Sequence, residues 1–213
     1  MSPWPISLAA LALVALVAGL FPQRLMREAT DGAWTRSDGA RLAATAFGVG
    51  LLALVGLMTV AADRMGWRTA CALSVCGALL TAVAVTDAKA LVVADLHVIA
   101  LLVLALVGPL TQYLPYALAG AAVGGGLLFG VRWAFSRVRG VEGLGLGDVK
   151  LMAALGALVG PERVLWIIVA GAVLGLAWAM ARRGRREGSV AVPLAAASAL
   201  PALAVLLLSV LKP

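Results

Sequence analysis

The amino-acid sequence predicts an all-α, polytopic membrane protein with about eight transmembrane helices in a single domain spanning residues 1–213. Apolar residues make up 63% of the 213 residues, charged residues make up only 13%, and the mean hydropathy is +1.04. A soluble domain of this size does not need so much apolar surface. Helices and closed barrels satisfy their own backbone hydrogen bonds in lipid, and the apolar runs lack the alternation of barrel strands. The sequence therefore favours helices.

Polar and helix-breaking residues divide the chain into segments of helical length. No lysine or arginine precedes the first apolar run, so we interpret it as a span and not as a cleavable signal peptide. Gly108-Pro109 ends the fourth span, Pro161 suits the start of the seventh, and the basic run 182–186 stops the seventh. The expected spans are 1–20, 42–62, 69–86, 96–107, 116–135, 148–159, 164–181 and 191–211.

The distribution of basic residues predicts that the N-terminus is outside. With that orientation, thirteen of the 17 lysines and arginines fall on the cytoplasmic side and four on the outer side. This asymmetry follows the positive-inside rule. The net charge of +7 is thus explained by membrane topology, and we do not interpret it as a sign of nucleic-acid binding.

Two aspartates are the strongest candidates for chemistry. Residues 142–150 read EGLGLGDVK, a flexible polar segment that contains Asp148, and Asp87 ends an earlier apolar run. Two spans separate them, so both fall on the cytoplasmic side. The span after Asp148, residues 149–159, is short: about 16 Å against a hydrocarbon core of about 30 Å. We therefore expect Asp148 inside the membrane, beside a water-accessible pocket. The simpler alternative is that Asp148 only N-caps the next helix.

These motifs resemble those of the type IV prepilin peptidases. Residues 142–156 closely resemble the GxGD motif of that family, including the following lysine and leucine. Asp87 and Asp95 have the spacing of the family's other motif, although Ala94 stands where the family often has proline. Pro193 weakly resembles a late proline-rich motif. The resemblance covers residues 69–199, the expected peptidase-like core.

The resemblance implies a membrane-embedded aspartic endopeptidase of the bacterial inner membrane. Its substrates would be prepilin-like precursors for pili or secretion systems, cleaved at the cytoplasmic face, and its other partners would be membrane lipids. Asp87 and Asp148 match the catalytic pair, and two such carboxylates activate water without a metal or cofactor.

The same resemblance and the local charges indicate which further residues support the catalytic loop or bind the substrate. We expect Gly145, Gly147 and Lys150 to support the catalytic loop. The candidates for substrate binding are Asp95 and Glu142, because each is an acidic residue near the pair that could receive a basic leader.

One departure from the family predicts against methyltransferase activity. Many members carry a large cytoplasmic loop with paired CxxC motifs, whereas the corresponding segment 21–41 contains no cysteine. The two cysteines, Cys71 and Cys76, lie in one span without a histidine pair. Their spacing does not suit a zinc site, so we expect packing roles for both. His97, the single histidine, is expected to pack as well.

Two alternative functions remain open. The presenilin and signal-peptide-peptidase group also uses GxGD, and Pro201-Ala202-Leu203 matches its PAL triplet. In that group, however, a tyrosine precedes the first aspartate, whereas here Thr86 precedes Asp87. A non-enzymatic proton or cation transporter would also place carboxylates in a membrane.

Overall fold

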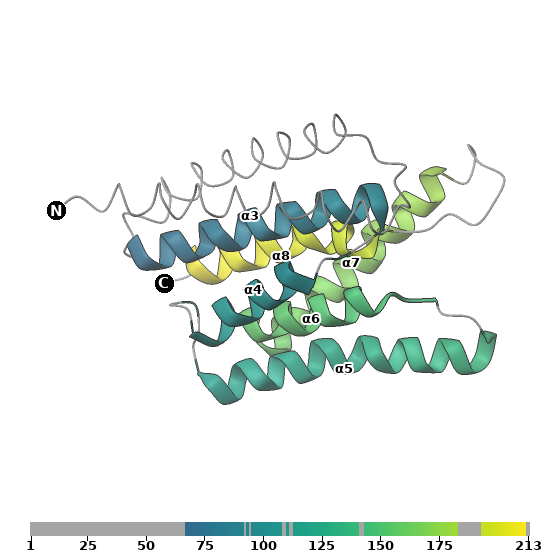
Figure 1. The fold of residues 1–213 in the computed structure, drawn as a ribbon, viewed down its shortest axis with the longest axis horizontal. Coiled ribbons are helices and arrows are strands. Elements are labelled where there is room, and N and C mark those ends of the chain that lie inside the picture. Colours follow the sequence, from purple (N-terminus) through teal and green to yellow (C-terminus); the bar gives the residue numbers. More distant parts are fainter. Residues whose placement is uncertain are drawn as a thin grey trace.

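The computed structural model describes residues 67–91, 93, 95–107, 110, 113–140, 143–182 and 193–211, and every regular element in these ranges is an α-helix. The helices run side by side as a bundle (Figure 1). They are α3 (Trp67–Ala90), α4 (Asp95–Val107), α5 (Leu114–Arg139), α6 (Leu146–Val159), α7 (Pro161–Arg182) and α8 (Leu194–Leu211). The all-α prediction is confirmed for this part of the chain. The expected spans 1–20 and 42–62 lie outside the described residues, and the number of spans and the side of the N-terminus remain predictions.

Helix ends differ from the expected spans where polar residues continue a helix. The expected spans 96–107 and 164–181 agree closely with α4 and α7. The prediction that the third helix ends at Asp87 is wrong, because α3 continues to Ala90. There the amide of Leu91, which has a left-handed φ of 56°, donates to the Asp87 carbonyl at 2.9 Å. Hydropathy marks where apolar character ends, whereas backbone hydrogen bonding decides where a helix ends.

Backbone hydrogen bonding likewise decides where α5 ends and where α6 begins. Helix α5 runs beyond the expected span to Arg139 and ends at Gly140, whose φ of 69° is left-handed. Glycine adopts this C-cap conformation without steric cost. Helix α6 begins at Leu146, before the expected start, so Asp148 lies inside its first turn.

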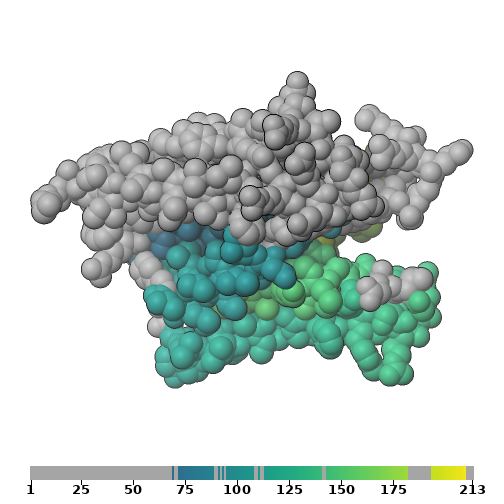
Figure 2. All heavy atoms as spheres, in the orientation of Figure 1, coloured from purple at the N-terminus to yellow at the C-terminus, as the bar shows by residue number. Residues whose placement is uncertain are grey.

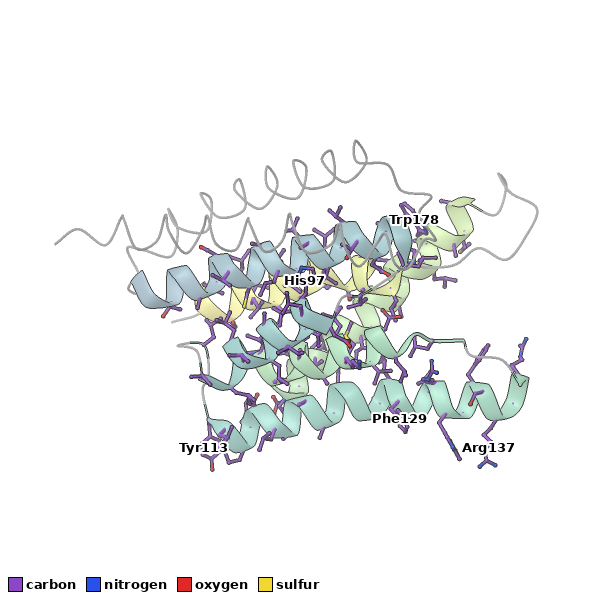
Figure 3. The ribbon with its side chains drawn as sticks, in the orientation of Figure 1. His97, Tyr113, Phe129, Arg137 and Trp178 are labelled. Carbon is purple, nitrogen blue, oxygen red and sulfur yellow. The ribbon has the colours of Figure 1, made fainter. Side chains whose placement is uncertain are left out.

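Within the described part of the chain, two helices are long and apolar enough to cross a membrane. They are Leu114–Arg139 and Pro161–Ala181, whereas the apolar parts of α3, α4 and α8 are shorter. Figure 2 shows α5 as a continuous band along one edge of the molecule. In Figure 3, Phe129 points from α5 away from the other helices. Exposed apolar and aromatic side chains suit a lipid-facing helix.

Helix α6 forms the centre of the described bundle. It contacts α4, α5, α7 and α8, and its residues from Ala154 through Val159 are buried in succession. A helix that is buried around its whole circumference belongs to the core. The first turn of α6 carries Asp148, so the most enclosed helix also carries a candidate catalytic residue.

Glycines bring the backbones of α5 and α6 into direct contact. A Cβ atom on Gly156 would stand 2.0 Å from the carbonyl oxygen of Gly120, and a Cβ atom on Gly120 would stand 2.0 Å from that of Gly156. One turn further along the pair, a Cβ atom on Gly124 would stand 2.3 Å from the carbonyl oxygen of Met152. Small residues at four-residue spacing permit this close approach in membrane helices. The contacts fix an antiparallel register between the two helices.

This register sets the level of Asp148 along α5. Continuing the pairing by one turn places Leu128 level with Asp148. Helix α5 continues from Leu128 to Arg139, which extends it by about 16 Å at about 1.5 Å per residue. The basic end of α5 therefore projects well beyond the first turn of α6.

Candidate functional site

Asp87 lies in the last turns of α3 and points toward the first turn of α8. The residue is only 4% exposed, and Oδ2 accepts a hydrogen bond from the amide of Ala196 at 2.8 Å. The first amides of a helix have no partner within that helix. Asp87, which is distant in the sequence, supplies such a hydrogen-bond partner to the Ala196 amide. The contact explains how a carboxylate is accommodated at a buried position.

Asp148 is the third residue of α6, and Gly145 is the residue that caps the helix. The alternative that Asp148 is itself the N-cap residue is therefore wrong. Its carboxylate instead lies beside Gly145, where a Cβ atom would stand 3.4 Å from Asp148 Oδ2. An acidic residue at this third position commonly accepts a hydrogen bond from the backbone of the cap residue. The start of α6 thus orients the Asp148 side chain.

The structure brings Asp87 and Asp148 together at the start of α8. The two carboxylates lie close enough to repel one another, and the Ala195 amide faces both of them. Asp148 Oδ1 is buried, and no hydrogen-bond partner for it is present among the described residues. Two carboxylates that lie close together cannot both ionise easily. This arrangement can hold one acid and one base close together.

Neither Gly145 nor Gly147 has a left-handed backbone conformation, and of the two only Gly147 lies where a side chain lacks space. Gly145 has an ordinary extended conformation, with φ −67° and ψ 142°, and a Cβ atom there would stand 3.4 Å from Asp148 Oδ2. Gly147 lies inside the first turn of α6, where a Cβ atom would stand 2.9 Å from the Cβ atom of Val93. A side chain at Gly147 would therefore press Val93 away from α6.

Lys150 and Asp95 form an ion pair between α6 and α4. Lys150 Nζ lies 2.9 Å from Asp95 Oδ1 and 3.1 Å from Oδ2, and the side chains are 52% and 63% exposed. An ion pair with this exposure contributes about 0–1 kcal/mol to stability. It nevertheless links the helix that carries Asp148 to the first turn of α4. Glu142, the other substrate-binding candidate, lies outside the described residues.

The amides of Ala195 and Ala196 are the part of the site that sequence reasoning missed. The expected span 191–211 placed these residues inside a helix, whereas α8 begins at Leu194, directly after Pro193. A proline just before an apolar run is a signal for a helix start. That signal indicates the position of the free amides, but it does not indicate which side chains they meet.

The remaining candidates are buried packing residues. His97 lies within the bundle on α4 (Figure 3), fully buried, and among the described residues neither ring nitrogen has a hydrogen-bond partner. Cys76 is fully buried in α3, as expected of a packing residue, and the side chain of Cys71 lies outside the described part. Within the described ranges, no three histidine, cysteine or acidic side chains gather into a possible metal site.

Comparison with known proteins identifies the family of this chain. Residues 74–180, half of the chain, match the sequence profile of the Type IV leader peptidase family. The chain belongs to this family. The matched residues include α4, α5 and α6 completely and contain both Asp87 and Asp148.

Similar members of the Type IV leader peptidase family bear the name prepilin leader peptidase/N-methyltransferase. The protein of Xanthomonas campestris pv. campestris is 40% identical over 124 residues, which cover 55% of this chain and 43% of that protein. The protein of Pseudomonas aeruginosa is 37% identical over 121 residues, which cover 54% of this chain and 41% of that protein. The aligned part therefore spans less than half the length of these relatives. No solved structure matches the chain.

Proposed function

We propose that this protein is a membrane-embedded aspartic endopeptidase that removes the leader peptide from prepilin-like precursors at the cytoplasmic face. The observation that carries the proposal is the meeting of Asp87 and Asp148 at the start of α8. Membership of the Type IV leader peptidase family supports the same conclusion. The names of the relatives supply the substrate class.

In the proposed reaction, the two aspartates act as base and acid. Asp87 accepts a hydrogen bond from the Ala196 amide, which favours a carboxylate ready to take a proton from water. That water attacks the scissile carbonyl carbon. Asp148, whose Oδ1 has no partner among the described residues, donates a proton to the carbonyl oxygen. Asp87 then passes the proton from water to the departing amine as the peptide bond breaks, and Asp148 takes back a proton from the new carboxyl group.

We further propose a multi-pass arrangement in the bacterial inner membrane, with about eight spans and the N-terminus outside. Helices α5 and α7 have the length and apolar character of spans. The basic end of α5, with Arg137 and Arg139, would lie at the cytoplasmic surface. Asp148 would then lie below that surface, and the exposed Lys150–Asp95 pair would face water rather than lipid.

Cleavage of a precursor tests the proposed function directly. The full chain is co-expressed with candidate prepilins, and the N-terminus of each product is sequenced. We expect cleavage at the leader junction of at least one precursor. Proton uptake by liposomes that contain the purified protein, together with intact precursors, would instead favour the transporter alternative.

Activity of this chain alone is expected to survive metal chelation and to leave the product unmethylated. The reason is that two carboxylates can activate water without a metal, and segment 21–41 carries no cysteine. Mass spectrometry of the product, before and after treatment with a chelator, measures both properties. An added methyl group on the new N-terminus would contradict this prediction.

The acidic candidates predict a dependence on the charge of the leader. We expect Asp95→Lys and Glu142→Lys to weaken binding of a basic leader more than binding of a neutral one. Because Lys150 Nζ lies 2.9 Å from Asp95 Oδ1, Lys150→Met should have the opposite effect by leaving the Asp95 charge unpaired. Salt should reduce all these differences. KM values for paired leader peptides at low and high salt provide the measurement, and equal changes for both leaders would show that these acids do not read leader charge.

A further inference from the structure

Helix α5 carries an arginine that contacts the glycine segment before Asp148. Arg132 is partly buried and lies about two turns before the end of α5. A partly buried guanidinium group on a membrane helix needs polar partners. Its Nη1 donates a hydrogen bond to the carbonyl oxygen of Leu144. The arginine thereby joins the cytoplasmic half of α5 to the segment 143–145.

The Leu144 carbonyl lies outside α6 and receives its hydrogen bond from another element. The helix ladder begins one residue later, where the amide of Val149 donates to the Gly145 carbonyl at 3.5 Å. A backbone carbonyl without a ladder partner requires another donor when water is excluded. Arg132 supplies such a donor with a charged group, and charge-assisted hydrogen bonds are stronger than neutral ones.

Phe135 makes a second contact between α5 and the same segment. A Cβ atom on Gly143 would stand 2.4 Å from two ring atoms of Phe135, so in this arrangement the position has room for glycine alone. Residues three apart lie on the same face of a helix. Arg132 and Phe135 therefore hold two consecutive residues of the glycine segment from one side.

These contacts continue the register of the α5–α6 pair beyond the start of α6. Gly124 opposes Met152. Two turns further along α5, Arg132 opposes Leu144, which keeps the same antiparallel register. The residue after Leu144 is Gly145, which lies against the Asp148 carboxylate: a Cβ atom on Gly145 would stand 3.4 Å from Asp148 Oδ2. A shift of Leu144 would therefore move the residue that borders this carboxylate.

We infer that Arg132 is a positioning residue that, together with Phe135, fixes the glycine segment 143–145 on α5 and thereby sets the orientation of Asp148. The effect on cleavage rests on the proposed function, whereas the effect on the segment itself does not. Arg132 acts through the Leu144 carbonyl and has no part in the chemical steps.

The first test measures the segment without requiring catalysis. Arg132→Met keeps a side chain of similar length but removes its donors, and Arg132→Lys keeps a charge and a donor group. Arg137→Met is the matched control, because Arg137 is an exposed arginine on the same helix that stacks over Trp133 at 5.2 Å. We expect hydrogen exchange of amides 143–147 to be about tenfold faster in Arg132→Met, the factor expected when the charged hydrogen bond to the Leu144 carbonyl is lost. Arg132→Lys should give a smaller change, and Arg137→Met should give none.

The second test measures catalysis in the same variants. We expect kcat to fall by at least about tenfold in Arg132→Met while KM changes little, because a small displacement of a catalytic group costs rate rather than binding. The pH profile of kcat should shift, and Arg132→Lys should recover most of the activity. Unchanged exchange in Arg132→Met, or faster exchange with an unchanged kcat and pH profile, would overturn the inference.

A compensating pair of substitutions tests the same contact if Arg132→Met does not fold. Gly143→Ala should accelerate exchange and slow cleavage, because its methyl group meets the Phe135 ring. Phe135→Leu in the same chain makes room and should restore both measurements. Failure of the pair to restore exchange would contradict the role of this contact. If the wild-type protein cleaves no precursor, the proposed function fails, while the exchange measurements still decide whether α5 anchors the segment.

Discussion

Asp87→Asn and Asp148→Asn are each expected to abolish precursor cleavage. Asparagine has nearly the size of aspartate but can neither take a proton from water nor supply one to the substrate. Loss of a general acid or base costs about 10²–10⁴-fold in rate, and groups that act as a unit do not add. We therefore expect each single variant to lose about as much kcat as the double variant. Cleavage of a precursor by purified protein, with the product quantified over time, measures the loss.

Folding should survive both of these substitutions, which separates chemistry from stability. The amide oxygen of an asparagine at position 87 can still accept the hydrogen bond from Ala196, which Asp87 accepts at 2.8 Å. Asp95→Asn is the matched control, because Asp95 is an exposed aspartate at the start of α4. It should retain some activity, because Asp95 is proposed to bind the leader and takes no part in proton transfer. Full activity in either Asp87→Asn or Asp148→Asn would exclude the proposed pair, and complete loss in Asp95→Asn would show that Asp95 belongs to it.

Gly156→Ala and Gly120→Ala are expected to destabilise the bundle strongly. In each variant the new methyl carbon would stand 2.0 Å from a carbonyl oxygen of the facing helix, so α5 and α6 must move apart. Overpacking of this kind costs about 1–3 kcal/mol, and about 2–4 °C in Tm accompanies each kcal/mol in a chain of this size. Thermal unfolding of the purified variants in detergent measures the loss. Cleavage should fall as well, because the same register sets the start of α6.

Gly126→Ala on the same helix provides the control. A Cβ atom on Gly126 would meet nothing within 4 Å. Alanine is favoured over glycine inside a helix by about 0.5–1 kcal/mol, so this variant should be at least as stable as the wild type. Equal losses of Tm in Gly126→Ala and Gly156→Ala would show that helix propensity, and not the contact between α5 and α6, governs these positions.

The sequence by itself predicted the helical class, the approximate positions of the six described helices and the two aspartates as candidates for catalysis. Apolar runs with proline and glycine at their ends predict α4 and α7 closely, because these signals act within a few residues of the chain. The GxGD segment and the earlier aspartate indicate the family, which the match over residues 74–180 confirms. These features depend on local patterns and on composition.

Only the tertiary structure decided how the site is assembled. Asp87 meets the Ala196 amide across 109 residues of sequence, and Arg132 meets the Leu144 carbonyl from a neighbouring helix. In both contacts one partner is a backbone group, which every residue possesses, so no residue type in the sequence marks it. The space that requires Gly147 is likewise set by Val93 on another segment. Such contacts arise from the packing of α6 at the centre of the bundle, and the local sequence carries no signal for them.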